Sequence, residues 1–293
     1  MLRKRRGAVS LLFCAALALV SAASSYAQVS SVTNYEEAVG GGRKTTYLDL
    51  LRKIFPDAEM ETGPGIDTAV AHRTIPLSHL FGDYKGKVYE GEMKIEQIER
   101  LQAKGQNSGH LLLLVHALGP EIFSWDKISV LALFQLEPSF KLLDAGDVQA
   151  DQFTSFWEEK PQLQIGPQHE AVIVESDHHN SSQSYLSLTM IATEGGKLKT
   201  AFDFPTLLHG NDCGNTFSQT PSVSVMKDVT GAHYNIMVKV KLVKEPDDES
   251  CEKRTRGYTR YYESLLVWNS AKRRYETRGR GLDQLARFNQ KNY

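Results

Sequence analysis

The stretch that decides the fold is Tyr234-Asn235-Ile236-Met237-Val238-Lys239-Val240-Lys241-Leu242-Val243. Apolar residues occupy every second position from Ile236 to Leu242, and lysines fill two of the positions between them. Successive side chains of an extended chain point to opposite faces, so this alternation predicts a β-strand with one buried and one solvated face. The stretch therefore indicates a sheet that covers a core on one side.

Strand-like runs continue in both directions along the chain from residue 110. They lie at 111–117, 128–136, 171–175, 185–192, 198–204, 223–226 and 258–268. Residues 111–115 are apolar on both sides, which predicts a strand in the middle of a sheet. The runs also show a loose rhythm, which either a genuine repeat or plain antiparallel hairpins would produce. We expect a mainly β protein with antiparallel sheets, as a degenerate β-propeller-like array or a β-sandwich.

The first 27 residues have the composition of an export signal. A basic head at 3–6 precedes an apolar run at 8–23, and the small-residue pattern Ser25-Tyr26-Ala27 offers a cleavage point. The apolar run is shorter than the roughly 20 residues that span a bilayer. We expect a signal peptide at 1–27 that is cleaved after Ala27, and a periplasmic or secreted protein without a transmembrane segment after cleavage.

The mature chain divides further by composition. Residues 28–45 are polar and Gly-rich, which predicts a flexible leader. Residues 46–105 predict an N-terminal helical and irregular region: apolar residues at helical spacing over 46–55 end at Pro56, 57–87 is irregular, and 92–104 fits either a helix or a strand. Residues 106–293 are expected to form the β-rich domain, with a short closing helix at 282–288.

The cysteines follow from the predicted export. Cys14 lies within the signal, so the mature chain keeps Cys213 and Cys251. Two cysteines in an oxidising compartment are most simply one disulfide, and no Cys-x-x-Cys spacing indicates a metal or redox pair. We predict a Cys213–Cys251 disulfide.

Charge is balanced overall and uneven along the chain. The net charge of −1 argues against a dedicated nucleic-acid or membrane-surface protein. Residues 144–177 hold eight acids and one lysine, whereas 252–293 hold eleven Lys or Arg and four acids. Either the two segments face each other, or the basic one forms a surface for polyanions. We expect an unknown partner that is a protein, a glycan or envelope material, and not nucleic acid.

Residues 228–238 resemble a known repeat. Asp228-Val229-Thr230-Gly231-Ala232-His233-Tyr234-Asn235-Ile236-Met237-Val238 is similar to the Asp-x-x-Gly-Asp-Gly-x-x-Asp-hydrophobic signature of FG-GAP/VCBS-type β-propeller repeats, which are common in exported proteins. Ala232 and His233 stand at the family's Asp-Gly pair, and Asn235 at its later acid. The resemblance implies a propeller-like architecture and assigns neither calcium ligands nor an active site.

The densest set of reactive groups lies at 175–183, where Asp177, His178 and His179 are candidate ligand-binding residues. Neighbouring residues of a strand point to opposite sides, so the two histidines cannot easily hold one metal ion. A metal site would need a third ligand from His169, His209 or Asp212, and no cofactor is assigned. The alternatives are a polar hairpin loop and a metal-dependent or His/Asp hydrolase that uses the 175–183 and 209–213 loops.

A second candidate site is the basic and aromatic stretch 254–262. Arg256, Tyr258 and Arg260 are its candidate ligand-binding residues, because Arg and Tyr hold sugar rings or nucleic acid through charge and stacking. On a strand, Tyr258, Arg260 and Tyr262 share one face. Export makes nucleic acid the less favoured ligand. We therefore predict an exported, non-enzymatic binding or scaffolding protein with no assigned catalytic residue.

Overall fold

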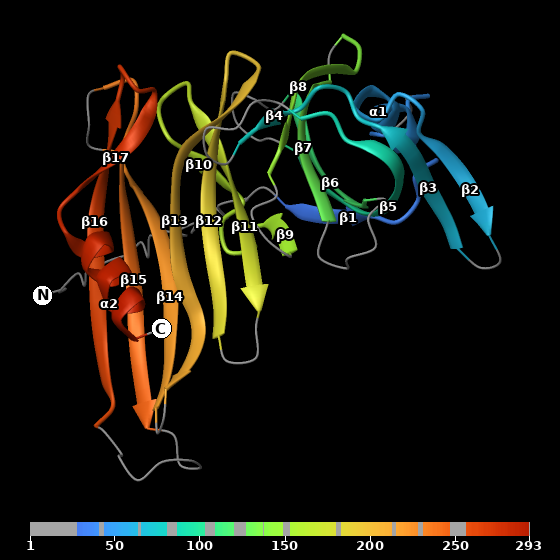
Figure 1. The fold of residues 1–293 in the computed structure, drawn as a ribbon. Coiled ribbons are helices and arrows are strands. Elements are labelled where there is room, and N and C mark those ends of the chain that lie inside the picture. The colour runs from blue at the N-terminus through green and yellow to red at the C-terminus, as the bar shows by residue number, and fades with distance from the viewer. Residues whose placement is uncertain are drawn as a thin grey trace, which may run out of the picture.

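The computed structural model describes residues 28–40, 44–63, 66–80, 87–102, 109–119, 127–136, 138–148, 153–179, 183–212, 215–227, 231–246 and 256–292. These residues form two large sheets, almost wholly antiparallel, and two helices (Figure 1). The predicted mainly β class is therefore confirmed. The predicted signal at 1–27, the turn at 180–182, Cys213, Cys251 and residues 228–230 lie outside the described residues.

The first sheet has the order β2-β3-β5-β6-β7-β8-β4, with β1 on the same edge of β5 as β3. Its strands are β1 (Val29–Val32), β2 (Glu59–Gly63), β3 (Ile66–Arg73), β4 (Ser78–His79), β5 (Glu90–Gln102), β6 (His110–Leu118), β7 (Lys127–Gln135) and β8 (Lys141–Asp147). Only the short β4–β8 pair is parallel among the described strands.

The second sheet is a meander in chain order from β10 to β17, with β9 beside β10 on the edge of β11. Its strands are β9 (Phe153–Phe156), β10 (Gln162–Gln164), β11 (Glu170–His179), β12 (Gln183–Glu194), β13 (Lys197–Asp212), β14 (Asn215–Met226), β15 (Asn235–Pro246), β16 (Tyr258–Asn269) and β17 (Arg274–Arg278). The alternating stretch from Ile236 to Leu242 lies in β15, and its apolar residues are buried as the alternation predicts.

The two sheets pack together through an apolar layer that both contribute to. Its fully or nearly fully buried members include Leu112, Leu114, Leu131, Leu133, Val172, Val174, Ile191 and Leu198. The central strands β6 and β7 are buried on both faces, as predicted for residues 111–115. Of the two architectures expected, the described strands match the sandwich-like one.

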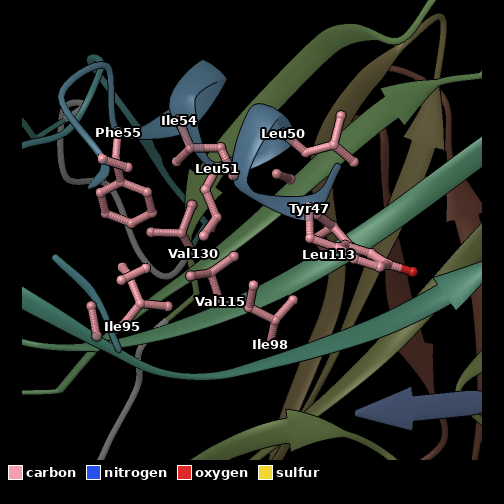
Figure 2. Packing of buried hydrophobic residues seen from close by; sticks show 14 of the residues in the cluster. Tyr47, Leu50, Leu51, Ile54, Phe55, Ile95, Ile98, Leu113, Val115 and Val130 are labelled. Carbon is pink, nitrogen blue, oxygen red and sulfur yellow. The ribbon is translucent and has the colours of Figure 1, made fainter. Parts of the chain in front are cut away.

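Helix α1 (Tyr47–Ile54) covers the face of the first sheet that points away from the second sheet. Thr46 caps it: the Asp49 amide donates to Thr46 Oγ1 at 3.2 Å, and the Thr46 amide donates to Asp49 Oδ2 at 2.9 Å. Figure 2 shows the apolar residues of the helix against β5, β6 and β7. The helix predicted over 46–55 is confirmed.

Two expectations about the N-terminal third differ from the structure, which also decides an alternative that the sequence left open. Residues 28–45, expected to be a flexible leader, contain β1 and bury Val32, Tyr35 and Val39. Residues 57–87, expected to be irregular, contain β2, β3 and β4. The segment 92–104, which fits either a helix or a strand, is part of the strand β5 as far as residue 102, and 103–104 lie outside the described residues. The physical reason is main-chain pairing: β1 and β3 pair with β5, β2 pairs with β3, and β4 pairs with β8. Hydrogen bonds between main chains leave little trace in side-chain composition.

Helix α2 (Gly281–Asn292) lies over the face of the second sheet that points away from the first (Figure 1). It contains the closing helix predicted at 282–288. Its first residue, Gly281, lies so close to β16 that an added methyl group would overlap the Glu263 carbonyl. The Leu282 amide donates to Ser264 Oγ at 3.0 Å, which satisfies a free amide of the first turn. Neither described helix is long and apolar enough to cross a membrane.

The contact at Gly281 gives a testable prediction. Gly281→Ala should lower the free energy of unfolding by about 1–3 kcal/mol, the usual cost of forcing extra atoms into a packed site. Gly109→Ala is the matched control, because a methyl group there meets nothing within 4 Å. Urea unfolding of both variants measures the difference, and an equal loss in both would contradict the close seat of α2.

Candidate functional site

The strand pairing of β15 and β16 decides which way the predicted site residues point. Leu242 lies opposite Arg260 and Val240 opposite Tyr262, so both β16 residues share the face of the buried β15 side chains. Tyr258 lies on the same face, whereas Tyr261 points to the other face and is 57% exposed. The predicted shared face of Tyr258, Arg260 and Tyr262 is confirmed, and it is the face that carries α2.

A cavity of about 460 Å³ opens between β16 and α2. Its lining residues are Arg260, Tyr262, Gln284, Arg287, Phe288 and Lys291. We call this cavity the basic groove, because it combines three cationic side chains with two aromatic rings. Arg287 and Lys291 are one helical turn apart, which places both on the side of α2 that borders Arg260.

Aromatic rings extend the basic groove along the sheet. The Arg260 guanidinium lies 4.6 Å from the centre of the Tyr258 ring, and Lys244 Nζ lies 5.8 Å from the same ring. Lys244 Nζ is also 5.4 Å from the Phe217 ring, whose centre is 5.8 Å from that of Phe288. Cations at these distances are attracted to ring faces, so the rings hold Arg260 and Lys244 near the groove without neutralising them.

Among the described residues, no acid neutralises the charges of the basic groove. In the part of the chain that the structure describes, no carboxylate oxygen lies within 4.0 Å of a side-chain nitrogen of Arg260, Arg287 or Lys291. On the opposite face of the same sheet, by contrast, Lys239 pairs with Glu263 at 2.7 Å. Three free cations around one cavity give it a positive potential that attracts anions.

Buried polar contacts hold α2 in place behind the basic groove. Gln219, which is buried on β14, donates from Nε2 to Asn289 Oδ1 at 2.5 Å. Its Oε1 accepts the Leu207 amide at 3.0 Å, so both ends of the amide are engaged. Leu285 is buried against the sheet. The helix that borders the basic groove is therefore fixed to the sheet by the side chains that it directs at the sheet.

The second predicted set, at 175–183, is only partly brought together. His179 Nε2 lies 3.0 Å from Asp177 Oδ2, and His179 Nδ1 lies 2.7 Å from Ser184 Oγ on the neighbouring strand. His178 points to the opposite face of β11, away from these groups.

His209 lies opposite Ser184 in the strand pairing and is exposed, whereas the side chain of Asp212 is outside the described atoms. The hairpin stands apart from β16, which carries Tyr258 and Arg260, and Arg256 is exposed just before β16.

Sequence reasoning missed several of the residues that border these sites. Arg287, Phe288 and Lys291 join the basic groove only because α2 packs on β16. The helix predicted at 282–288 ends before Lys291, so the sequence did not place the two cations on one helix. A second cavity of about 530 Å³, which was not expected at all, is lined in part by Glu99, Ser155 and Glu158. Glu99 is buried there and accepts the Phe156 amide at 3.0 Å, which satisfies the edge of β9.

Glu175 lies beside this second cavity and is partly buried. Ser155 Oγ donates to Glu175 Oε1 at 3.1 Å. The pKa of Glu175 is raised to about 7, mainly by burial and also by the charges of Asp177, Glu158 and Glu99, against the opposing Ser155 hydrogen bond. The carboxyl group therefore changes charge near neutral pH.

No family model, no curated protein and no solved structure matches the chain. The function is therefore inferred from the sites themselves.

The raised pKa of Glu175 predicts a pH-dependent stability. The folded chain holds the Glu175 proton more tightly than the unfolded chain, so the free energy of unfolding falls as pH rises from about 4.5 to about 7. Glu175→Gln should remove this dependence, worth at most about 1.4 kcal/mol per pH unit. Urea unfolding at several pH values measures it, with exposed Glu159→Gln as the control. Parallel pH profiles of wild type and Glu175→Gln would contradict the assignment.

Proposed function

We propose that the protein is an exported, non-enzymatic binding protein whose ligand is an acidic glycan held in the basic groove. The observation that carries the proposal is the set of three cations, without carboxylate partners among the described residues, around one cavity lined by aromatic rings. The volume of the basic groove, about 460 Å³, lies within the range of roughly 300–1,000 Å³ that is typical of small-molecule sites.

The pairing of aromatic rings with cations favours a sugar that carries carboxylate, sulfate or phosphate groups. Arginine binds such oxyanions through two parallel hydrogen bonds, and an aromatic ring offers a flat apolar face to a sugar ring. Tyr262 and Phe288 supply that face, while Arg260 and Arg287 supply donors from two sides of the cavity. Both features belong to the same groove, so one ligand can use both.

The predicted export favours a glycan over nucleic acid. A signal peptide at 1–27 would place the mature chain in the periplasm or outside the cell, where acidic polysaccharides occur and nucleic acid is scarce. The Cys213–Cys251 disulfide stays a prediction. It is supported by the pairing of Asn215 with Pro246, because these described residues lie two and five positions from the two cysteines in the chain. The FG-GAP/VCBS resemblance of 228–238 also stays a prediction.

The proposal predicts that the purified chain binds dextran sulfate and does not bind neutral dextran. Arg260→Gln and Arg287→Gln should each weaken dextran sulfate binding by about tenfold or more, because each removes a charge-assisted hydrogen bond worth about 1.5–3 kcal/mol. Fluorescence anisotropy of labelled polymer measures the affinity at two salt concentrations, and binding should weaken at the higher one.

Arg73→Gln is the matched control, since Arg73 is an exposed arginine on β3 of the first sheet. Equal weakening by Arg73→Gln would show that the polymer senses net charge only. Tight binding of neutral dextran, or of a single-stranded oligonucleotide in preference to dextran sulfate, would also overturn the proposal.

A hydrolase that uses the 175–183 hairpin is the second candidate, favoured by the hydrogen-bonded series Asp177–His179–Ser184. This series has the order acid, base and hydroxyl that activates a serine nucleophile. His179 is 49% exposed, however, and neither cavity above is lined by these residues, so the water exclusion that acyl transfer needs is not provided there.

A serine-reactive fluorophosphonate separates the two candidates. If the protein is non-enzymatic, mass spectrometry should find no adduct on the peptide that contains Ser184. A stoichiometric adduct on Ser184 that disappears in His179→Ala would support the hydrolase and count against the binding proposal. Denatured protein is the control for unspecific labelling.

A further inference from the structure

Four segments that are distant in sequence meet at the end of the second sheet where β16 ends and β17 begins. His169 lies just before β11, Glu194 ends β12, His233 precedes β15, and Arg273 lies in the turn between β16 and β17. Their side chains form one cluster, in which Glu194 contacts the other three. This cluster is separate from the basic groove, the hairpin series and the cavity beside Glu175.

The donor atoms of the cluster have the spacing of metal ligands. His169 Nδ1 lies 3.3 Å from Glu194 Oε1, and His233 Nε2 lies 3.5 Å from the same oxygen. All three ligand atoms lie within 4.8 Å of one another. Zinc bonds of about 2.0–2.1 Å in a tetrahedron place neighbouring ligands about 3.3 Å apart. The two distances from Glu194 Oε1 to the histidine nitrogens therefore match the spacing of tetrahedral zinc ligands closely.

The His233 ring is buried with an unused nitrogen. Its side chain is only 8% exposed, and its Nε2 makes no hydrogen bond among the described residues although it faces Glu194. An imidazole nitrogen without a partner in a buried place is costly, which a bound cation would offset.

Aromatic stacking fixes the orientation of both histidine rings. The His233 ring lies between His169, at 4.2 Å between ring centres, and Trp268, at 3.9 Å. Tyr275 meets the Trp268 ring edge-on at 5.1 Å. The column leaves the His233 ring little freedom to turn, so its nitrogen stays aimed at Glu194. Preorganised ligands of this kind reduce the entropy lost when a metal binds.

The outer contacts have the arrangement that supports a metal ligand. Arg273 Nη2 donates to Glu194 Oε2 at 2.7 Å, which leaves Oε1 directed at the histidines. The Tyr234 amide donates to the Ile165 carbonyl at 2.7 Å, and Tyr275 Oη donates to the Tyr234 carbonyl at 2.9 Å. These bonds fasten the loop of His169 to the loop of His233. Carboxylate and histidine ligands are typically held by such surrounding hydrogen bonds.

We propose that His169, Glu194 and His233 form a binding site for a divalent transition metal, with Zn²⁺ as the ion that the ligand set suits best. Two imidazoles and one carboxylate are a common zinc ligand set, which requires no cysteine. His169 is 25% and Glu194 22% exposed, which leaves solvent access to the site. With three protein ligands, the ion keeps a fourth position for water or another exchangeable ligand.

The test is titration of the metal-free full chain with Zn²⁺ in a calorimeter. One Zn²⁺ per chain should bind, and His169→Gln and Glu194→Gln should each lower the affinity at least tenfold, as loss of a ligand does. Co²⁺ bound at the same site should show the strong visible absorption of tetrahedral coordination. Both substitutions are at partly exposed side chains, and circular dichroism checks that the variants fold.

His72→Gln is the matched control, because His72 is an exposed histidine on β3. The proposal is supported if His72→Gln binds Zn²⁺ as the wild type does while His169→Gln and Glu194→Gln do not. It is overturned if the wild type binds no stoichiometric Zn²⁺, or if folded His169→Gln and Glu194→Gln bind it unchanged. Dextran sulfate binding should be the same with and without Zn²⁺, which distinguishes this site from the basic groove.

Discussion

The apolar layer shared by the two sheets is the constraint on which the rest of the structure depends. Leu112 and Leu114 point into it from β6, while Leu113 and Val115 point from the same strand towards α1. A shift of the pairing by one residue would exchange these two sets, so the layer fixes the register of the central strands. Each fully buried leucine contributes about 1.5–3 kcal/mol, so a shifted register would lose several such contributions.

That layer also determines where polar chemistry is possible. Because the two sheets pack together over only part of their area, the layer ends at polar residues such as Glu99, which caps the edge of β9, and Ser176. The strands from β14 to β17 lie beyond it and use their other face to bind α2 (Figure 1). The basic groove is a consequence, since α2 covers the apolar part of that face and leaves the cations of β16 at its border.

Sequence patterns predicted the features that depend on side-chain periodicity. These are the strands β6, β7 and β11 to β16, the two helices, the burial of β6 on both faces, and the face shared by Tyr258 and Arg260. The shorter strands β8, β9, β10 and β17 were not predicted. The patterns also did not predict β1 to β3, which are held by main-chain pairing of β1 and β3 to β5 and of β2 to β3. Nor did they assemble His169, Glu194 and His233, because only the meander brings residues so far apart in the chain to one end of the sheet.

The basic groove and the cluster of His169, Glu194 and His233 both border β16 and are nevertheless electrostatically independent. Arg260 lies near the beginning of β16 and Trp268 near its end, a separation of eight residues or about 26 Å along an extended strand. The Debye length at physiological salt is about 8 Å, so the field of the groove is screened before it reaches Glu194. Arg273 compensates Glu194 locally as well. Coupling between the two sites would therefore have to pass mechanically through β16, whose pairing to β15 and β17 holds it in place.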